Sequence, residues 1–337
     1  MKKSTLALVL LAGLSTATFA QNKIDQQGRK QGHWLRTDRN GAKIYEGDFK
    51  DGLEVGTFNY YYPNGTLRIR NVFTKPGRYC SHEAFDEQGH LLARGYYNQK
   101  NRDSIWNYYN ESGRLVKTAG YKMGIKQGAH IIYTSKGDTA EITHWNDNHR
   151  EGRWWKRIGE KGYITGHFKN GGLEGVLTEY DDEGRLIRKG NYKNGLKNGS
   201  YQYFDNKTLI VDETWNAGAM SERKVLITHA KPEYISVANI AYVYPSRQKC
   251  ILVRMDGSTV QIAESIETMT SRIGDADFST IDKRNRILAN TNCIRGFSHD
   301  EDGREIILLE PHASFNVYPD AEMKKLVQSV LRGDEME

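Results

Sequence analysis

The sequence contains 337 residues, carries a formal net charge of +6 at pH 7, and has a mean hydropathy of -0.71. Apart from the N-terminus, the chain contains no stretch that is apolar enough to span a bilayer as a helix. Aromatic residues make up 11% of the chain and there are 33 glycines but 6 prolines, a composition that favours many short strands and turns over helices. The length suffices for two domains.

The N-terminus has the features of a secretory signal peptide. "MKKSTLALVLLAGLSTATFAQ" begins with two lysines, continues with an apolar run from Leu6 to Leu14, and ends in small residues at Ala20. We predict cleavage after Ala20, which would leave a mature chain that is exported to the periplasm, the cell envelope or the extracellular space. No cysteine follows the apolar run, so a lipid-anchored lipoprotein is not expected.

A glycine-centred phrase recurs along the first two thirds of the chain. Examples are "DFKDGLEVG", "GYKMGIKQG" and "NYKNGLKNG". The spacing between the closing residues of the phrase is 24 throughout, except for one step of 23. These residues are Gly32, Gly56, Cys80, Ser104, Gly128, Gly152, Gly175 and Gly199. The period indicates eight repeats, with Cys80 and Ser104 in the glycine position of two of them.

Aromatic residues recur at fixed offsets from this closing residue. Two residues after it, most repeats carry a ring: Trp34, Phe58, Trp106, Trp154 and Tyr201. About seventeen residues after it stand Phe49, Phe73, Tyr97, Tyr121, Trp145, Phe168, Tyr192 and Trp215. Repeat 80–103 lacks the early aromatic residue and repeat 152–174 is one residue short, so we expect irregularities there.

Each repeat has the pattern of a β-hairpin. In "GTFNYYYPNGTLRIRNVF", Asn64-Gly65 separates two runs of alternating aromatic and polar residues, and both turn residues can adopt a positive φ. One hairpin alone is marginally stable, whereas stacked hairpins bury their rings against each other. The sequence therefore predicts a mainly β fold: an elongated single ribbon of stacked hairpin repeats over residues 21–218.

This pattern resembles the MORN-type repeat family in its bacterial variant. The family's glycine-aromatic and Asn-Gly elements correspond to Gly56-Thr57-Phe58 and Asn64-Gly65, and its "Y-x-x-G-x-x-x-G" element to Tyr121–Gly128. The resemblance covers about residues 28–218. It implies a repeat scaffold and leaves the function open, because such repeats serve as scaffolds and binding surfaces in unrelated settings.

The rings are expected to form the core of a thin protein. Consecutive strand residues point to opposite faces, so the neighbouring tyrosines of "NYYY" and "NYYN" cannot all face inward. For these extra tyrosines, core and surface positions are equally compatible with the pattern. Among them, Tyr61 and Tyr109 are the candidates for an exposed binding surface.

The pattern changes after Gly218. Residues 219–337 have a net charge of -3, whereas the first 218 residues have a net charge of +9. The region contains strand-like runs, a hairpin turn at Asp256-Gly257 and two helical patterns. The first, "SIETMTSRI", places Ile266, Met269 and Ile273 on one stripe; the second follows Asp320, a plausible N-cap. We predict a small β-rich domain with one or two helices over residues 219–337.

This region resembles the LytTR-type DNA-binding domain of bacterial response regulators over about residues 233–332. The stretches that carry the resemblance are "ISVANIAYV", "ILVRMDGSTVQIAESIETM", "FSTIDKRNRILANTNCIRGF" and "IILLEPHASFNVYPDAEMKKL". The resemblance implies that DNA would be contacted by loops. The DNA-contact candidates are Arg247, Lys283, Arg284 and Arg286.

Several departures from the LytTR pattern argue against DNA binding. Asp282 stands where the family has a histidine, and Pro319-Asp320 replaces an arginine pair. DNA affinity depends mainly on neutralised phosphates, whereas this region is net acidic. An exported protein would also not meet the chromosome.

The three cysteines give neither a metal signature nor a disulfide framework. Cys250 and Cys293 lie in one region, so both a single bridge and two independent buried thiols are compatible with the sequence. The histidines show no H-E-x-x-H motif or comparable ligand spacing, and no nucleophile or nucleotide motif occurs. We expect no catalytic residues, metal or cofactor.

Three functional hypotheses follow. The first is a non-catalytic exported repeat protein that acts as a binding or scaffold module. Its partner would be an envelope protein or an anionic glycan or lipid headgroup surface, which a basic, tyrosine-rich face would suit. The second is a LytTR-type transcription regulator, the one case in which DNA is the partner. The third is an unrecognised hydrolase, for which facing carboxylates in a cleft would be the sign.

Overall fold

The structure, a computed structural model, describes residues 22–247, 249–274, 277–282 and 286–332. The predicted signal peptide, residues 1–20, lies outside the described residues. The chain divides into two compact units between His149 and Arg150. We refer to residues 22–149 as the N-terminal unit and to the described residues from Arg150 as the C-terminal unit, and each is described by itself.

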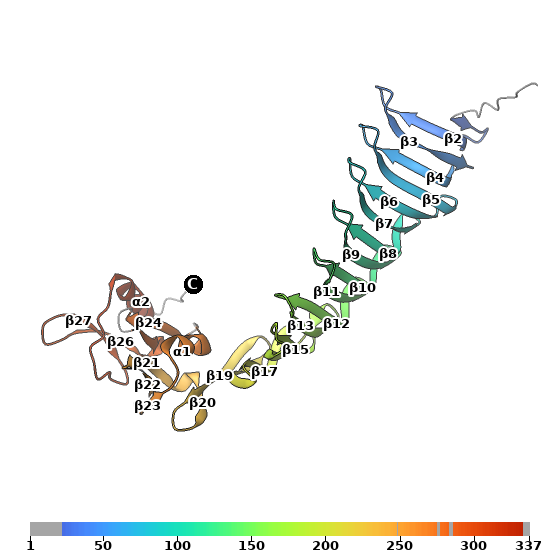
Figure 1. Cartoon of the computed structure of the whole chain (residues 1–337). Helices are drawn as coiled ribbons and strands as arrows, with labels where there is room; N and C mark the ends of the chain where they lie inside the picture. Colours follow the sequence, from blue (N-terminus) through green and yellow to red (C-terminus); the bar gives the residue numbers. More distant parts are fainter. Residues whose placement is uncertain (1–21, 248, 275–276, 283–285, 333–337) are drawn as a thin grey trace, which may run out of the picture. The chain divides into compact units, whose positions relative to one another are not determined.

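The N-terminal unit is a series of antiparallel strands that pair with their neighbours in chain order (Figure 1). A short first strand pairs with the second. The strands are β1 (Lys23–Ile24), β2 (Lys30–Thr37), β3 (Lys43–Lys50), β4 (Leu53–Tyr61), β5 (Leu67–Lys75), β6 (Tyr79–Phe85), β7 (Leu91–Asn98), β8 (Asn101–Tyr109), β9 (Leu115–Lys122), β10 (Ile125–Tyr133) and β11 (Thr139–Asn146).

The hairpin series continues in the C-terminal unit with the same antiparallel pairing. In the short repeat a strand is split in two around Glu174, whose backbone N–H donates to the His167 carbonyl at 2.9 Å. The strands are β12 (His149–Ile158), β13 (Gly162–Lys169), β14 (Gly172–Leu173), β15 (Gly175–Tyr180), β16 (Leu186–Lys193), β17 (Leu196–Asp205), β18 (Thr208–Asn216), β19 (Ala219–Thr228) and β20 (Pro232–Ser236).

A smaller β-rich region with two α-helices completes the chain. Its five-stranded antiparallel sheet has the order β23-β22-β21-β25-β24, and β26 and β27 form a separate hairpin. The strands are β21 (Ile240–Ser246), β22 (Lys249–Arg254), β23 (Thr259–Ile262), β24 (Phe278–Asp282), β25 (Ile287–Asn290), β26 (Ile294–His299) and β27 (Glu305–Leu309). The helices are α1 (Ile266–Ile273) and α2 (Ala321–Arg332), with 3-10 turns at Val237–Asn239 and Thr291–Cys293.

The mainly β fold class, with hairpin repeats followed by a small β-rich region, is therefore confirmed. Among the described residues, no helix has the length and apolar character needed to cross a membrane.

Both sequence-predicted helices form. Helix α1 buries Ile266, Met269 and Ile273, and the Ser265 hydroxyl accepts a hydrogen bond from the Thr268 backbone N–H at 3.2 Å. Helix α2 begins after Asp320, whose carboxylate accepts the Met323 backbone N–H at 2.8 Å. These contacts satisfy N–H groups that the first turn of a helix leaves unpaired.

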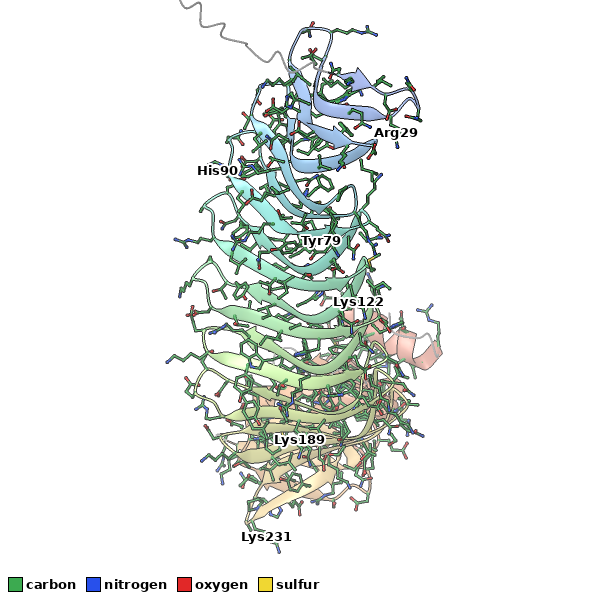
Figure 2. The ribbon with its side chains drawn as sticks, turned by 90° about the vertical axis from the view of Figure 1, so that its right-hand side faces the viewer. Arg29, Tyr79, His90, Lys122, Lys189 and Lys231 are labelled. Carbon is green, nitrogen blue, oxygen red and sulfur yellow. The ribbon has the colours of Figure 1, made fainter. Side chains whose placement is uncertain are left out.

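The two edges of the hairpin series carry different turns. At the Asn64-Gly65 edge Gly65 alone has a positive φ, at 84°; its N–H donates to the Tyr62 carbonyl, and the strand register shifts next to the turn. The expectation that both residues adopt a positive φ is wrong here, because the loop is one residue longer than a two-residue turn and the glycine forms a bulge. At the opposite edge both central residues of most turns have a positive φ, as in Asn194-Gly195 at 51° and 83°, whereas in the turn between β5 and β6 only Gly77 does. In Figure 2, His90 lies at the first edge and Arg29 and Lys122 at the second.

The turns of the second edge connect each repeat to the preceding one. The N–H of Gly52 donates to the Lys30 carbonyl at 2.9 Å, and the N–H of Gly124 to the Arg102 carbonyl at 2.7 Å. Equivalent bonds end on Glu54, Arg78, Lys126, Arg150, Leu173 and Lys197. Each acceptor lies two residues before the closing residue of a repeat, so the 24-residue period corresponds to a repeated hydrogen bond between hairpins.

One face of the hairpin sheets, which we call the ring face, carries the aromatic columns. Its centre alternates large rings with small residues on the adjacent strand. Phe58 lies opposite Gly47 and is 1% exposed, and a Cβ added to Gly47 would lie 2.2 Å from the Phe58 ring. The same close approach occurs between Gly95 and Trp106 at 2.4 Å, and between Gly190 and Tyr201 at 2.0 Å. The rings thus pack directly on the backbone of a neighbouring strand, which confirms the expectation that they form the core.

The β-rich region has two hydrophobic cores, one on each side of its five-stranded sheet. The first core contains Val243 and Cys250 and extends to Val211 and Val225 of β18 and β19. The second contains Tyr242 and Cys293. The last repeat strands therefore share a core with the region that follows Gly218, although the sequence pattern changes at that residue.

All three cysteines are free and buried. Cys250 and Cys293 belong to the two different cores, so the sheet separates their thiols. Of the two alternatives left open by the sequence, the independent buried thiols are correct and the bridge is wrong.

The packing of rings on glycines predicts the effect of a single methyl group. We expect Gly95→Ala to destabilise the protein by roughly 1–3 kcal/mol, because the added Cβ would overlap the Trp106 ring. Gly166→Ala is the matched control, since its Cβ would lie 3.5 Å from Leu173 and 3.7 Å from Trp154, which are ordinary contact distances. Urea unfolding of both full-length variants measures the difference. Equal destabilisation would contradict this account of the ring face.

Candidate functional site

The ring face carries a column of cations beside its rings. The Lys30 ammonium lies 4.5 Å from the centre of the Trp34 ring and 4.7 Å from that of Phe49. The Lys197 ammonium lies 4.0 Å from the rings of both Tyr201 and Trp215. Arg102, Lys126 and Arg150 make equivalent contacts at 4.1 to 5.5 Å. All five stand two residues before a closing residue, so the repeat supplies its own cation to the rings.

The series of ring contacts is interrupted at β5. On one side Phe58 contacts Tyr60 with ring centres 5.4 Å apart, and on the other Tyr97 contacts Trp106 at 4.9 Å. Among the described residues, no ring-to-ring contact crosses β5. The interruption lies on the strand before repeat 80–103, which the sequence marks as irregular.

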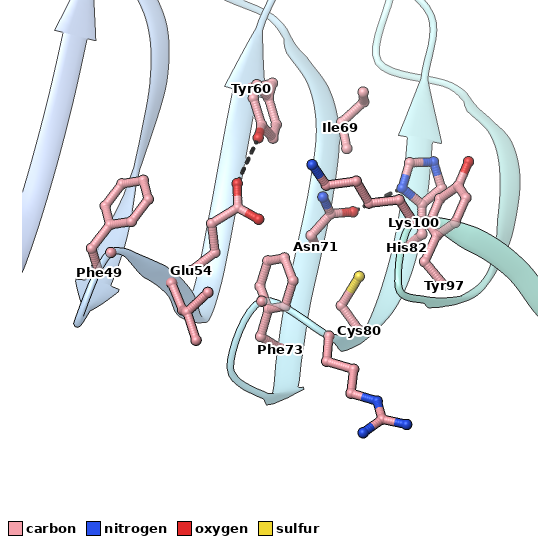
Figure 3. Close-up of a pocket in the computed structure, with 14 residues that line it drawn as sticks. Phe49, Glu54, Tyr60, Ile69, Asn71, Phe73, Cys80, His82, Tyr97 and Lys100 are labelled. Carbon is pink, nitrogen blue, oxygen red and sulfur yellow. Dashed lines mark hydrogen bonds between the residues drawn. The ribbon is translucent and has the colours of Figure 1, made fainter. Parts of the chain in front are cut away.

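A hollow of about 580 Å³ occupies this interruption (Figure 3). It lies over β4 to β7 on the ring face, since Tyr60 pairs with Ile69, Asn71 with His82 and Cys80 with Tyr97 across the strands. Its lining residues are Phe49, Gly52, Leu53, Glu54, Tyr60, Ile69, Asn71, Phe73, Gly77, Arg78, Cys80, His82, Tyr97 and Lys100. This hollow is the candidate functional site.

Five polar side chains of the hollow replace the usual residues of the repeat. Glu54 stands in the cation column, and Asn71 in the row of small residues that includes Gly47 and Gly95. The other three are Cys80 in the glycine position, His82 in the early ring position and Lys100 in the glycine position of the turn. Each replacement introduces a side chain that can form hydrogen bonds, and all five line the same hollow.

Glu54 is bound by one hydroxyl. The Tyr60 hydroxyl donates to its carboxylate at 3.2 Å, and Figure 3 shows this bond among the residues that line the hollow. Burial, and next the Glu54 charge, raise the pKa of Tyr60, so its hydroxyl stays protonated and remains a donor. Among the described residues Glu54 forms no ion pair.

His82 holds the place of a core ring. It is 8% exposed and packs edge-on against Tyr97 with ring centres 4.9 Å apart. Its Nδ1 lies 2.8 Å from the Asn71 side-chain oxygen, so the protonated Nδ1 donates to that oxygen. Burial, with a smaller contribution from the Arg102 charge, lowers the pKa of His82 to about 4. The imidazole is therefore neutral at physiological pH.

The remaining groups do not form a hydrolytic site. Burial raises the pKa of the Cys80 thiol to about 11, which disfavours the nucleophilic thiolate. Glu54 is the one carboxylate that lines the hollow, so facing carboxylates are absent from its described lining. Within the described ranges no group of three or more metal-ligating side chains comes together.

The candidate surface tyrosines lie on the opposite face of the sheet from the hollow. Tyr61 and Tyr109 are both half-buried, and each is covered by a cation: Lys43 lies 5.6 Å from the Tyr61 ring and Arg94 5.7 Å from the Tyr109 ring. The Tyr61 hydroxyl also donates to Glu46, and its pKa is raised to about 12, chiefly by burial. These contacts hold the two tyrosines against the sheet, and their role in binding stays a prediction.

Two of the four DNA-contact candidates can be placed. Arg247 and Arg286 line a smaller hollow of about 220 Å³ together with Glu264 and Glu267, and the Arg286 guanidinium forms an ion pair with Glu267. Lys283 and Arg284 lie outside the described residues. The two carboxylates beside the arginines reduce the positive charge that a phosphate contact would need.

Sequence reasoning missed the hollow although the repeat contained a signal for it. His82 stands 24 residues after Phe58 and 24 before Trp106, so aligning the repeats places an imidazole in the ring column. The same alignment places Glu54 with Lys30, Arg78 and Arg102. The statement that repeat 80–103 lacks an early aromatic residue is correct for Phe, Tyr and Trp, but His82 takes the place of that ring.

No protein-family model matches the chain, and no curated protein matches its sequence. The resemblances to MORN-type repeats and to the LytTR domain therefore remain predictions.

The depressed pKa of His82 predicts a pH-dependent stability. Because the folded pKa is about 4 and the unfolded value 6.5, the unfolded chain binds more protons between these values, and stability falls as the pH falls through this range. At pH 5 the loss relative to pH 7 is about 2 kcal/mol from this group. We expect His82→Phe to remove this part of the loss, as measured by urea unfolding at both pH values. An unchanged pH dependence in the variant would contradict a neutral buried His82.

Proposed function

We propose that the protein is a non-catalytic, exported binding module that holds its partner in the hollow over β4 to β7. The observation that carries this proposal is the convergence of five polar replacements on one hollow. Single replacements of these kinds also occur outside the hollow, such as His130 in the early ring position and Thr143 in the row of small residues, so the support comes from five of them lining one hollow.

The size and composition of the hollow support binding. Its volume of about 580 Å³ falls within the range of roughly 300–1,000 Å³ that is typical of small-molecule sites. Its walls combine rings, such as Phe73 and Tyr97, with convergent polar groups. Rings supply contact area and polar groups fix orientation, which is the usual division in a binding site.

The absence of catalysis is inferred from the groups in the hollow. The thiol of Cys80 is held in its protonated form, and among the described residues no hydrogen bond joins that thiol to the imidazole of His82, whose Nδ1 donates to Asn71. Nucleophilic catalysis requires a base beside an activated nucleophile, and acid–base glycoside hydrolysis requires two carboxylates. The sequence of the first 20 residues supports export.

Export is tested by locating the protein and sequencing its mature N-terminus. We expect Gln21 as the first residue, in the envelope or extracellular fraction of the cells, because a signal peptidase cleaves after small residues such as Ala20. A cytoplasmic protein that retains residues 1–20 would overturn the export part of the proposal and favour the DNA-binding alternative.

Binding through the hollow is tested with labelled mature protein and isolated cell envelopes. We expect the triple variant Glu54→Gln, Arg78→Gln, Lys100→Gln to reduce the fraction that sediments with the envelopes by about tenfold, the size expected from losing a charge-assisted hydrogen bond. The matched control is Glu87→Gln, Lys50→Gln, Lys122→Gln, which makes the same charge changes at exposed positions outside the hollow.

A third variant, Tyr61→Ala with Tyr109→Ala, tests the opposite face in the same assay. If the tyrosine variant still sediments with the envelopes and the triple variant of the hollow does not, the result supports the hollow as the binding site. Loss in the tyrosine variant alone would place the binding surface on the other face, and equal sedimentation of all variants would refute binding through either surface.

A further inference from the structure

The repeats themselves show which group their paired rings hold. In the first repeat the Lys30 ammonium lies within 5 Å of the ring centres of Trp34 and Phe49, and in the last the Lys197 ammonium contacts Tyr201 and Trp215 in the same way. Each pair consists of the early ring of a repeat and the ring that follows it on the next strand. An ammonium group is attracted to the electron-rich faces of both rings.

The equivalent ring positions beside the hollow have no cation. By repeat position they are Phe58 and Phe73, of which Phe73 lines the hollow, and the cation column is occupied there by Glu54. Within the part of the chain that the structure describes, no lysine or arginine lies over either ring. The Glu54 carboxylate has the Tyr60 hydroxyl as its partner, which leaves acceptor capacity free toward the hollow.

Two cations line the same hollow. Lys100 occupies a turn position with φ of 65°, where the equivalent residues of other repeats are mostly glycines, and its side chain extends across the hollow in Figure 3. Arg78 lies on an adjacent strand connection, and both residues are exposed. Neither side chain forms an ion pair with Glu54 or with any other described carboxylate.

We infer that the hollow binds a zwitterionic group, in which an ammonium lies next to a carboxylate or a phosphate ester. The ammonium contacts Glu54 and the ring of Phe73, and the anion contacts Lys100 and Arg78. This inference rests on the proposed function and specifies the chemistry of the ligand. The group could belong to a free amino acid or to a phosphoethanolamine headgroup, and the experiment distinguishes the two.

The charges of the hollow disfavour ligands of a single sign. A simple cation would meet two like charges at Lys100 and Arg78, and a simple anion would meet the carboxylate of Glu54. A neutral ligand would leave all three charged groups without a counter-charge. A ligand with both charges satisfies each of them, and like-charge contacts are a strong source of discrimination.

The experiment uses isothermal titration calorimetry of the full-length mature protein with four probes: L-leucine, N-acetyl-L-leucine, L-leucinamide and O-phosphoethanolamine. The acetyl compound lacks the ammonium and the amide lacks the carboxylate. We expect one of the two zwitterions to bind, and L-leucine, if it is the ligand, to bind at least about tenfold more tightly than the acetyl and amide compounds. The stronger zwitterion identifies the anion as carboxylate or phosphate.

Two variants separate binding from folding because each restores the repeat pattern. Glu54→Lys restores the cation that Lys30 supplies at the same position of its repeat, and Lys100→Gly supplies the residue that best tolerates a positive φ. We expect both to fold with unchanged or higher melting temperature and to lose about tenfold or more in affinity for the zwitterion. Glu87→Lys, at an exposed turn outside the hollow, is the control and is expected to bind normally.

The outcomes distinguish this inference from the proposed function. Equal affinity for the zwitterion and its singly charged analogues, or full binding by Glu54→Lys, would overturn the zwitterion inference. Failure of all four probes would also overturn it, and the proposed function would still hold if the Gln triple variant lost envelope binding. Failure in both assays would refute the binding function itself.

Discussion

The hairpin repeats depend on the contact between an aromatic ring and the bare backbone of the adjacent strand. Phe58, Trp106 and Tyr201 lie so close to glycines on the preceding strand that a Cβ there would fall 2.0 to 2.4 Å from the ring. A thin sheet has no second layer, so each ring is buried by the strand beside it and, in most repeats, by a cation above it. This constraint accounts for the small residues that recur in the centre row and for the lysines and arginines that stand two residues before most closing residues.

The hollow arises where this constraint is relaxed. Asn71 and His82 replace a small residue and an aromatic ring, and Glu54 replaces a cation, so the packing that closes the face elsewhere is missing over β5. The replacement residues lose contacts that stabilise the other repeats. Polar groups retained at the expense of packing are typical of functional sites, where stability is sacrificed for binding. Lys100 fits this interpretation, because its left-handed backbone is unfavourable for a residue with a side chain.

Aligning the repeats identifies unusual residues, whereas the strand register shows which of them lie side by side. Aligning the repeats is sufficient to find His82 and Glu54 as departures, because each departs from a column with a period of 24. It does not show that Asn71 and Lys100 lie beside them. The register does so by placing Asn71 opposite His82 and by bringing the turn of Lys100 next to Arg78, whose carbonyl accepts the Gln99 N–H at 2.6 Å. The turn type at Gly65 likewise depends on loop length and register, which Asn-Gly alone does not specify.

The sequence by itself determined the hairpin period, the mainly β class, the ring columns and the two helices, because these follow from local turn preference and from side-chain periodicity. Tertiary structure alone decided which face each column occupies, that Cys250 and Cys293 lie on opposite sides of a sheet, and that five polar side chains share one hollow. These features depend on strand register and on bulges. A one-residue shift in register would move the side chains of a strand to the opposite face of the sheet, and the sequence of one strand alone does not specify its register.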